Sequence, residues 1–124
     1  MTINQAIGRL DALKPNSYSF GDKVMWLSEL DGTIKTEIID THEGWEDCLF
    51  EWYDDERTDP ETELLAEAPY DRMYITWLQA RIDYTNGEYQ KYNNANAMFE
   101  AEYAAFQNHY NRTHMPLAER FRYY

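Results

Sequence analysis

The chain has 124 residues, which is the length of one domain. Its 23 acidic and 11 basic residues give a net charge of −12, which argues against proteins that grip nucleic acids or anionic membrane surfaces. The mean hydropathy is −0.79, no apolar run approaches the ~20 residues of a membrane helix, and the first residues lack a signal-peptide pattern. Because the single cysteine, Cys48, has no partner for an internal disulfide, we expect an intracellular protein.

A first short helix is predicted at residues 3–13. Thr2 and Gln5 have the spacing of a capping box, in which each side chain binds a free backbone amide of the other residue. Pro15 disfavours helical backbone at the residue before it and therefore ends the helix. The apolar stripe of this helix is Ile3, Ala6, Ile7, Leu10 and Leu13.

A longer second helix is predicted at residues 22–41. Asp22 is a suitable N-cap, because its carboxylate can accept from the free amides of the first turn. Asp31 and Gly32 lie inside the helix, and this pair indicates a bend, a place of close packing or a boundary between two helices. The apolar stripe of this helix is Val24, Leu27, Leu30, Ile34 and Ile38.

Residues 42–68 are expected to form a long acidic loop, with an exposed tip at 54–62. Twelve acidic residues lie between positions 42 and 71, against the single base Arg57. The acids that mark the loop are Asp54, Asp55, Glu56, Asp59, Glu61 and Glu63. Aromatic and apolar residues are mixed with them, so this is no plain solvated linker, and a short hairpin that pairs 48–53 with 63–66 is an alternative.

A third and a fourth helix are predicted at residues 70–86 and 88–111, separated by Gly87. Large side chains recur along the fourth helix in steps of three and four, which places them on one face. Tyrosine suits half-buried positions, so we expect this face to contact both its own core and a protein partner. An ordinary helix packed on its own domain is the alternative. The stripe is Tyr89, Tyr92, Asn96, Phe99, Tyr103, Phe106 and Tyr110, and the candidate interface residues are Tyr89, Tyr92, Asn93, Asn96, Phe99 and Tyr103.

The predicted organisation is a single helical domain at residues 1–116 and a C-terminal arm at 117–124. The arm is rich in arginine and tyrosine, which are the residue types that most often anchor interfaces. A tail without function is the alternative. The candidate binding residues are Arg112, Arg120, Phe121, Arg122, Tyr123 and Tyr124.

No catalytic, metal-binding or cofactor-binding pattern is found, so we expect a protein that is not an enzyme. His109 and His114 are five residues apart, which does not place two ligands on one helical face. The acids near Cys48 are expected to raise the pKa of its thiol, which disfavours a nucleophile. The acidic stretch 54–59 lacks the glycine and the closing glutamate of a calcium loop, and no glycine-rich phosphate loop occurs.

Four stretches carry a resemblance to a known family. They are LDALKPNS at residues 10–17, APYD at 68–71, NGEYQKYNN at 86–94 and YNRTHMP at 110–116. With the sequence around them, they resemble small proteins from the structural-gene cluster of tailed phages and prophages of Gram-positive bacteria. Within that group the chain is similar to the head–tail connector, or head-completion adaptor, family. The variable, acidic stretch 45–58 departs from the family pattern.

The resemblance implies a structural virion protein at the head–tail interface, present in the host cytoplasm before assembly. It implies a homo-oligomeric ring, typically of twelve subunits, that extends the DNA channel beneath the portal protein and binds the next tail-proximal connector protein. It also implies that the arm from Arg112 onward docks into the portal. No specific nucleic-acid recognition, membrane contact or cofactor is expected.

Two other functions are compatible with the same residues. One is a different phage virion or tail-completion protein, which would differ only in its partners. The other is an acidic intracellular regulator that binds a basic protein in a salt-sensitive way.

Overall fold

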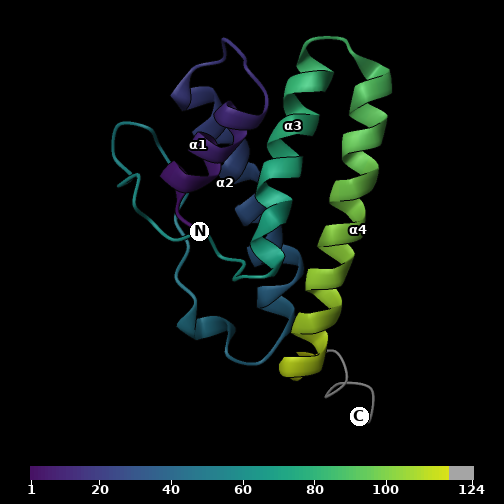
Figure 1. The fold of residues 1–124 in the computed structure, drawn as a ribbon. Helices are drawn as coiled ribbons and strands as arrows, with labels where there is room; N and C mark the ends of the chain where they lie inside the picture. The colour runs from purple at the N-terminus through teal and green to yellow at the C-terminus, as the bar shows by residue number, and fades with distance from the viewer. Residues whose placement is uncertain (118–124) are drawn as a thin grey trace.

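The computed structural model describes residues 1–117, in which the chain forms four α-helices joined by loops and short 3₁₀ turns (Figure 1). The helices are α1 (Ile3–Leu13), α2 (Phe20–Glu37), α3 (Met73–Thr85) and α4 (Tyr89–Thr113). The 3₁₀ turns are η1 (Ile39–Thr41), η2 (Trp45–Asp47) and η3 (Tyr70–Arg72). The prediction of an all-α fold with four main helices is confirmed.

Helix α3 occupies the centre of the molecule. It pairs along its length with α4, and α1 and α2 pack on its other side, so that α4 forms one edge (Figure 1). The core accordingly lies between α1, α2 and α3, whereas α4 buries only Phe99 and Phe106. Most of the 25-residue surface of α4 therefore remains outside this core.

The predicted helix boundaries need small corrections. The capping box of α1 is confirmed, since Thr2 Oγ1 accepts from the Gln5 amide and Gln5 Oε1 accepts from the Thr2 amide. Asp22 is not the cap of α2, because the hydroxyl of Ser19 accepts from the Asp22 amide and the helix begins earlier. A hydroxyl three residues upstream of an amide has the geometry that an N-cap requires.

The ends of the other predicted helices also shift. The second predicted helix leaves α geometry after Glu37 and continues as η1, and the third begins as η3 before it becomes α3. The fourth extends through Thr113, two residues beyond its predicted end. Helix ends commonly tighten into 3₁₀ turns, because terminal carbonyl groups lack partners in the α pattern.

Gly32 lies in the uninterrupted helix α2, so the boundary between two helices that Asp31-Gly32 could have indicated does not occur. A Cβ atom at Gly32 would lie 3.1 Å from Cη2 of Trp52. The glycine is therefore a place of close packing, where an indole from the long loop lies against the helix backbone.

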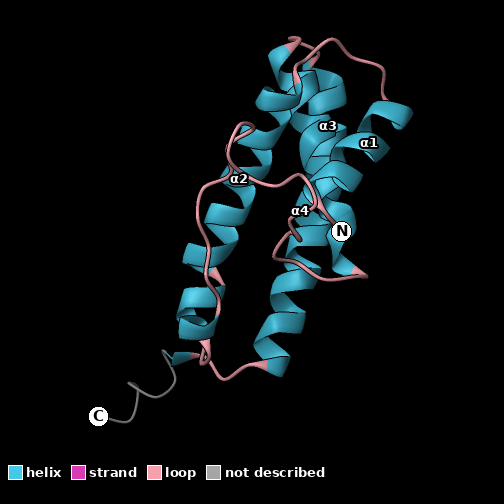
Figure 2. Cartoon of the chain, turned by 90° about the vertical axis from the view of Figure 1, so that its left-hand side faces the viewer, coloured by secondary structure: helices cyan, strands magenta, loops and turns pink. Residues whose placement is uncertain are grey.

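The loop between η2 and η3 returns along the start of α1. The amides of Ile3 and Asn4 donate to the carbonyl groups of Thr62 and Pro60, at 3.1 and 2.9 Å, and so satisfy two free groups of the helix N-terminus. The alternative hairpin was wrong: no strand is present in residues 1–117, and Figure 2 shows the connection as a loop across the helices. The returning segment pairs with the chain start instead of with residues 48–53.

Candidate functional site

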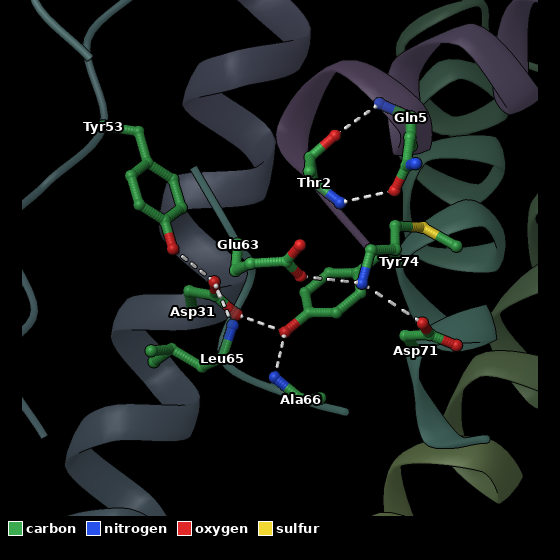
Figure 3. A network of polar contacts seen from close by, with 10 residues as sticks. Thr2, Gln5, Asp31, Tyr53, Glu63, Leu65, Ala66, Asp71 and Tyr74 are labelled. Atoms are coloured by element: carbon green, nitrogen blue, oxygen red, sulfur yellow. Dashed lines mark hydrogen bonds and ion pairs between the residues drawn. The ribbon is translucent and has the colours of Figure 1, made fainter. Parts of the chain in front are cut away.

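A buried carboxylate joins the helices to the long loop (Figure 3). Asp31 on α2 is 0% exposed and accepts hydrogen bonds from the hydroxyls of Tyr53 and Tyr74, at 2.5 and 2.6 Å, and from the Leu65 amide at 3.1 Å. The Tyr74 hydroxyl accepts in turn from the Ala66 amide at 2.8 Å. One side chain therefore holds α2, α3 and both limbs of the loop together.

The environment of Asp31 shifts the pKa values of the groups around it. Burial raises the pKa of the Asp31 carboxyl, and the three donated hydrogen bonds oppose that change. Burial also raises the pKa of both tyrosines, Tyr53 and Tyr74, and the charge of Asp31 raises each of them further. Both phenols consequently stay protonated at neutral pH and continue to donate.

Sequence reasoning missed the role of Asp31, which we interpreted only together with Gly32, as a bend, a place of close packing or a boundary between two helices. A signal was present, because Asp31 follows Leu27 by four residues and precedes Ile34 by three. That spacing places a carboxylate on the buried face of an amphipathic helix, where it needs hydrogen-bond donors. Which donors reach it could not be inferred from the local pattern.

The two limbs of the loop enclose an open hollow of about 800 Å³. Of the predicted acidic-loop residues, Asp54, Asp59 and Glu63 line it, together with Glu51 and the base Arg57. Its lining also contains the apolar and aromatic side chains Leu49, Phe50, Trp52, Tyr53 and Leu65. The other predicted acids, which are Asp55, Glu56 and Glu61, are exposed and do not line it.

The tip of the loop is folded by its own hydrogen bonds. The Asp54 amide donates to the Thr58 hydroxyl and the Thr58 amide donates to the Asp54 carbonyl, both at 2.8 Å. The Asp59 carboxylate accepts from the Glu61 amide at 2.9 Å. These side-chain to backbone bonds define turns, so the acids of the tip have particular positions.

Several candidate interface residues of α4 pack inside their own chain. Phe99 is 8% exposed and its ring lies 5.1 Å from that of Trp77. Tyr103 is half-buried and donates to Glu37 at 3.3 Å, and burial and this carboxylate raise the pKa of Tyr103 to about 12. The stripe of large side chains therefore does face the protein's own core.

The remaining candidate interface residues lie in the N-terminal half of α4. Tyr92 is partly buried beside Arg81, whose guanidinium lies 5.5 Å from the tyrosine ring centre. Asn96 donates to Glu100 of the same helix at 3.2 Å. Tyr89 is 62% exposed and Asn93 is also exposed, so these two present their side chains to a partner most directly.

The outward face of α4 carries a second pattern, which sequence reasoning did not use. Small, uncharged side chains follow one another there at helical spacing, and all of them are exposed. They are Asn94, Ala97, Met98, Ala101, Ala104, Ala105 and Asn108. Their spacing of three and four predicts one continuous face.

The three histidines pack against other side chains near the C-terminal end of α4, which we call the foot of α4. His42 is buried, its Nε2 lies 2.7 Å from Oδ1 of Asn111, and its ring meets that of Tyr110 edge-on. His109 stacks on Tyr70, and His114 stacks on Tyr110. No group of three metal-ligating side chains is found in residues 1–117.

Cys48 lines a smaller cavity of about 240 Å³ at this foot, together with His109 and His114. Burial raises the pKa of the Cys48 thiol, and the charge of Asp40 adds to the effect while Lys35 opposes it. The sequence also predicted a raised pKa for this thiol. The main cause is burial, however, and not the acidic residues next to Cys48 in the sequence. A thiol with a raised pKa is a poor nucleophile at neutral pH.

The candidate arm is only partly described. Arg112 is exposed in the last turn of α4. The other five candidate residues lie outside the described residues, and they are Arg120, Phe121, Arg122, Tyr123 and Tyr124.

The fold and these surfaces define an all-α protein with a folded acidic loop and an uncharged outer helix face. None of the helices in residues 1–117 is both long and apolar enough to cross a membrane. Comparison with protein-family models, with curated proteins and with solved structures finds no match for this chain.

Proposed function

We propose that this chain is a structural subunit of a tailed-phage virion, a head–tail connector that forms a ring between the portal and the tail. The observation that carries the proposal is the outward face of α4, from Asn94 to Asn108, which has no partner in the described chain. A subunit of a ring needs such a face, because it must present one surface to each neighbour.

The chemistry of this face favours a protein neighbour over solvent. At 1.5 Å per residue it extends for about 21 Å without a charged side chain, in a protein whose net charge is −12. The centres of protein interfaces are depleted in charged residues in the same way. The alanine side chains let another helix approach closely, and exposed Met98 offers an adaptable apolar contact.

The remaining surfaces fit the same assembly. An acidic wall lets DNA slide through a channel, since carboxylates do not bind phosphates as cations do. On this proposal the acidic loop contributes to that wall, and the arm from Arg112 to Tyr124 docks into the portal. The next tail-proximal protein binds the opposite side of the ring, which is placed at the head–tail interface of the virion.

The self-association is tested by light scattering on the purified chain, with one carboxylate added to α4. We expect Ala101→Glu to weaken ring formation at least tenfold, which corresponds to about 1.4 kcal/mol, because a charge at the centre of the face loses its water. Gln107→Glu is the matched control, since it adds the same charge to an exposed position outside this face. Equal association of both variants and of the wild type would count against the role of this face.

The portal contact is tested with the portal protein encoded in the same genome. We expect a complex between the two proteins that is lost when residues 118–124 are deleted and is retained by Gln107→Glu. Circular dichroism of the deletion variant verifies that its helices are intact. If the chain binds the portal protein neither as a monomer nor as a ring, the connector proposal is wrong.

A further inference from the structure

Arg81 lies between aromatic rings near the turn that joins α3 to α4. The Cζ atom of its guanidinium lies 4.5 Å from the ring centre of Trp77, 5.7 Å from that of Tyr84 and 5.5 Å from that of Tyr92. Trp77, Arg81 and Tyr84 follow one another on α3 at helical spacing, which puts them on one side of the helix. The faces of the rings attract the cation, so the guanidinium is held in one position before any ligand arrives.

The hydrogen-bond donors of this guanidinium are mostly unused within residues 1–117. Nη2 donates to the Tyr92 hydroxyl over a long distance of 3.4 Å, and Nε is buried without an acceptor. Nη1 makes no hydrogen bond to these residues and is not buried. No ion pair joins Arg81 to a carboxylate in this part of the chain. A carboxylate is the group that the planar fork of an arginine fits best.

The acidic side chains that are closest to Arg81 in sequence are paired with other cations. Asp83 pairs with Lys14 at 2.6 Å, and Glu88 pairs with Lys91 at 3.5 Å. The charge of Arg81 therefore remains unpaired near the turn, although the whole chain has a net charge of −12. An approaching carboxylate meets a local attraction here, in a chain that otherwise repels acids.

Two exposed tyrosines extend the same surface. Tyr84 is 54% exposed and Tyr89 is 62% exposed, and their ring centres lie 6.0 Å apart in an edge-to-face arrangement. Arginine and tyrosine are among the residues that most often dominate the binding energy of protein interfaces. A tyrosine ring loses little conformational entropy on binding, and it can cover an apolar side chain beside the carboxylate.

The end of the chain does not bring a carboxylate to this position. Pro116 pairs with His42 at the foot of α4, and Figure 1 shows this foot and the turn between α3 and α4 at opposite ends of the helix pair. The distance along α4 from Thr113 back to Tyr92 is about 31 Å, at a rise of about 1.5 Å per residue. Residues 118–124 cover at most about 25 Å when fully extended, so their carboxylates do not reach Arg81.

We propose that Arg81, Tyr84 and Tyr89 bind an acidic segment of a partner protein, in which a carboxylate lies beside an apolar side chain. The carboxylate pairs with the guanidinium at Nη1, and the two tyrosine rings cover the apolar side chain. Nucleic acids are not the expected ligands, because a single cation offers one phosphate contact and the net charge repels a polyanion. The binding of this segment does not rest on the connector proposal, which uses the outward face of α4 from Asn94 to Asn108.

The chemistry of the partner is tested by selection from a library of short random peptides displayed on yeast. The library is selected in parallel on the full wild-type chain and on its Arg81→Gln variant. We expect the peptides that are enriched only on the wild type to carry aspartate or glutamate next to an aromatic or aliphatic residue. If these peptides are instead basic, or if no peptide distinguishes the two proteins, the proposed site is wrong.

A selected peptide is then labelled with fluorescein, and a second version has its acidic residues replaced by their amides. We expect the amide version to bind the wild-type chain at least about tenfold more weakly in fluorescence anisotropy, because the guanidinium loses its charged partner. The Arg81→Gln variant should bind both versions with equal affinity, since the cation that distinguishes them is gone. If the variant prefers the acidic version by the same factor as the wild type, another cation binds the carboxylate and the assignment to Arg81 is overturned.

Further variants separate binding from folding, and circular dichroism verifies that each keeps its helices. Tyr89→Ser removes an exposed ring and should weaken binding of the acidic peptide about threefold. Arg81→Lys keeps the charge but loses the planar fork, so its loss should be smaller than that of Arg81→Gln. Arg72→Gln is the matched control, because it removes the same charge from an exposed position at the start of α3. A distant exposed charge is screened by salt, so the control should change the affinity less than about twofold. Equal losses in Arg72→Gln and Arg81→Gln would overturn the site.

A fluorescein-labelled oligothymidylate tests whether the ligand is a nucleic acid. We expect no saturable binding of this DNA, because the chain is strongly acidic. If the DNA binds the wild-type chain more tightly than the selected peptide does, and Arg81→Gln abolishes that binding, the site takes phosphate and the assignment to a protein partner is wrong.

Discussion

Asp31 places a carboxylate where donors from three distant parts of the chain meet. Tyr53, Leu65 and Tyr74 are 22, 34 and 43 residues away from it in sequence. A buried acceptor of this kind stabilises a fold only while every donor keeps its partner, because an orphaned buried donor loses its hydration without compensation. Asp31 is therefore one of the contacts that position the acidic loop, beside the backbone bonds from Ile3 and Asn4 to the returning limb.

Asp31→Asn is expected to lower the free energy of unfolding by about 2–4 kcal/mol. The amide has the same shape, but it replaces one acceptor oxygen by a donor that faces other donors. Urea denaturation measures the change. Glu29→Gln is the control, because Glu29 is exposed on the same helix, and its effect should stay within about 0.5 kcal/mol. Equal stability of the two variants would mean that the network contributes little.

The same variant has a second readout in the ionisation of the tyrosines. Removing the negative charge of Asp31 should lower the pKa of Tyr53 and of Tyr74, since a neighbouring carboxylate opposes formation of a phenolate. Burial remains, so the fall toward the ordinary value should be partial. The absorbance change of ionised phenol during an alkaline titration measures it. Tyr103 is the internal control, because its pKa is raised to about 12 by burial and by Glu37 and should not change in this variant.

At the scale of the elements, helix α2 and the long loop fit together at one glycine. Trp52 packs closely against the helix at Gly32, where a Cβ atom would crowd it, and the returning limb of the loop satisfies amides at the start of α1. Gly32 thus lowers helix propensity at a point where it permits a tertiary contact. The two effects can be separated by a double-mutant cycle.

Gly32→Ala should raise the stability by about 1 kcal/mol in a Trp52→Ala background, where only helix propensity changes. In the wild-type background the gain should be smaller by at least about 0.5 kcal/mol, since the new Cβ would crowd the indole. Chemical denaturation of the four proteins gives the coupling energy. Identical effects in both backgrounds would show that the indole does not constrain this position.

At the scale of the whole molecule, the net charge of −12 makes any two copies repel each other. The contact between copies proposed above uses the outward face of α4, which is uncharged. Salt screens the repulsion between the copies, so it should strengthen association through this face.

Raising the salt concentration from about 0.05 to about 0.5 M should strengthen association through α4. Sedimentation velocity of the wild-type chain at the two salt concentrations measures the change. Association that weakens as salt is added would contradict this prediction.

The sequence by itself determined the helices, because their signals are local. The spacing of apolar residues predicted all four helices, and Thr2 and Gln5 predicted a cap that involves neighbouring residues only. The tertiary structure alone decided the partners of Asp31, the packing of Trp52 on Gly32 and the path of the loop along α1. It also decided that Trp77 is the partner of Phe99, although the spacing along α4 had already predicted that Phe99 lies on the face toward the core. The physical reason is that these contacts join residues far apart in sequence, and a local pattern shows that a side chain needs a partner without showing which one.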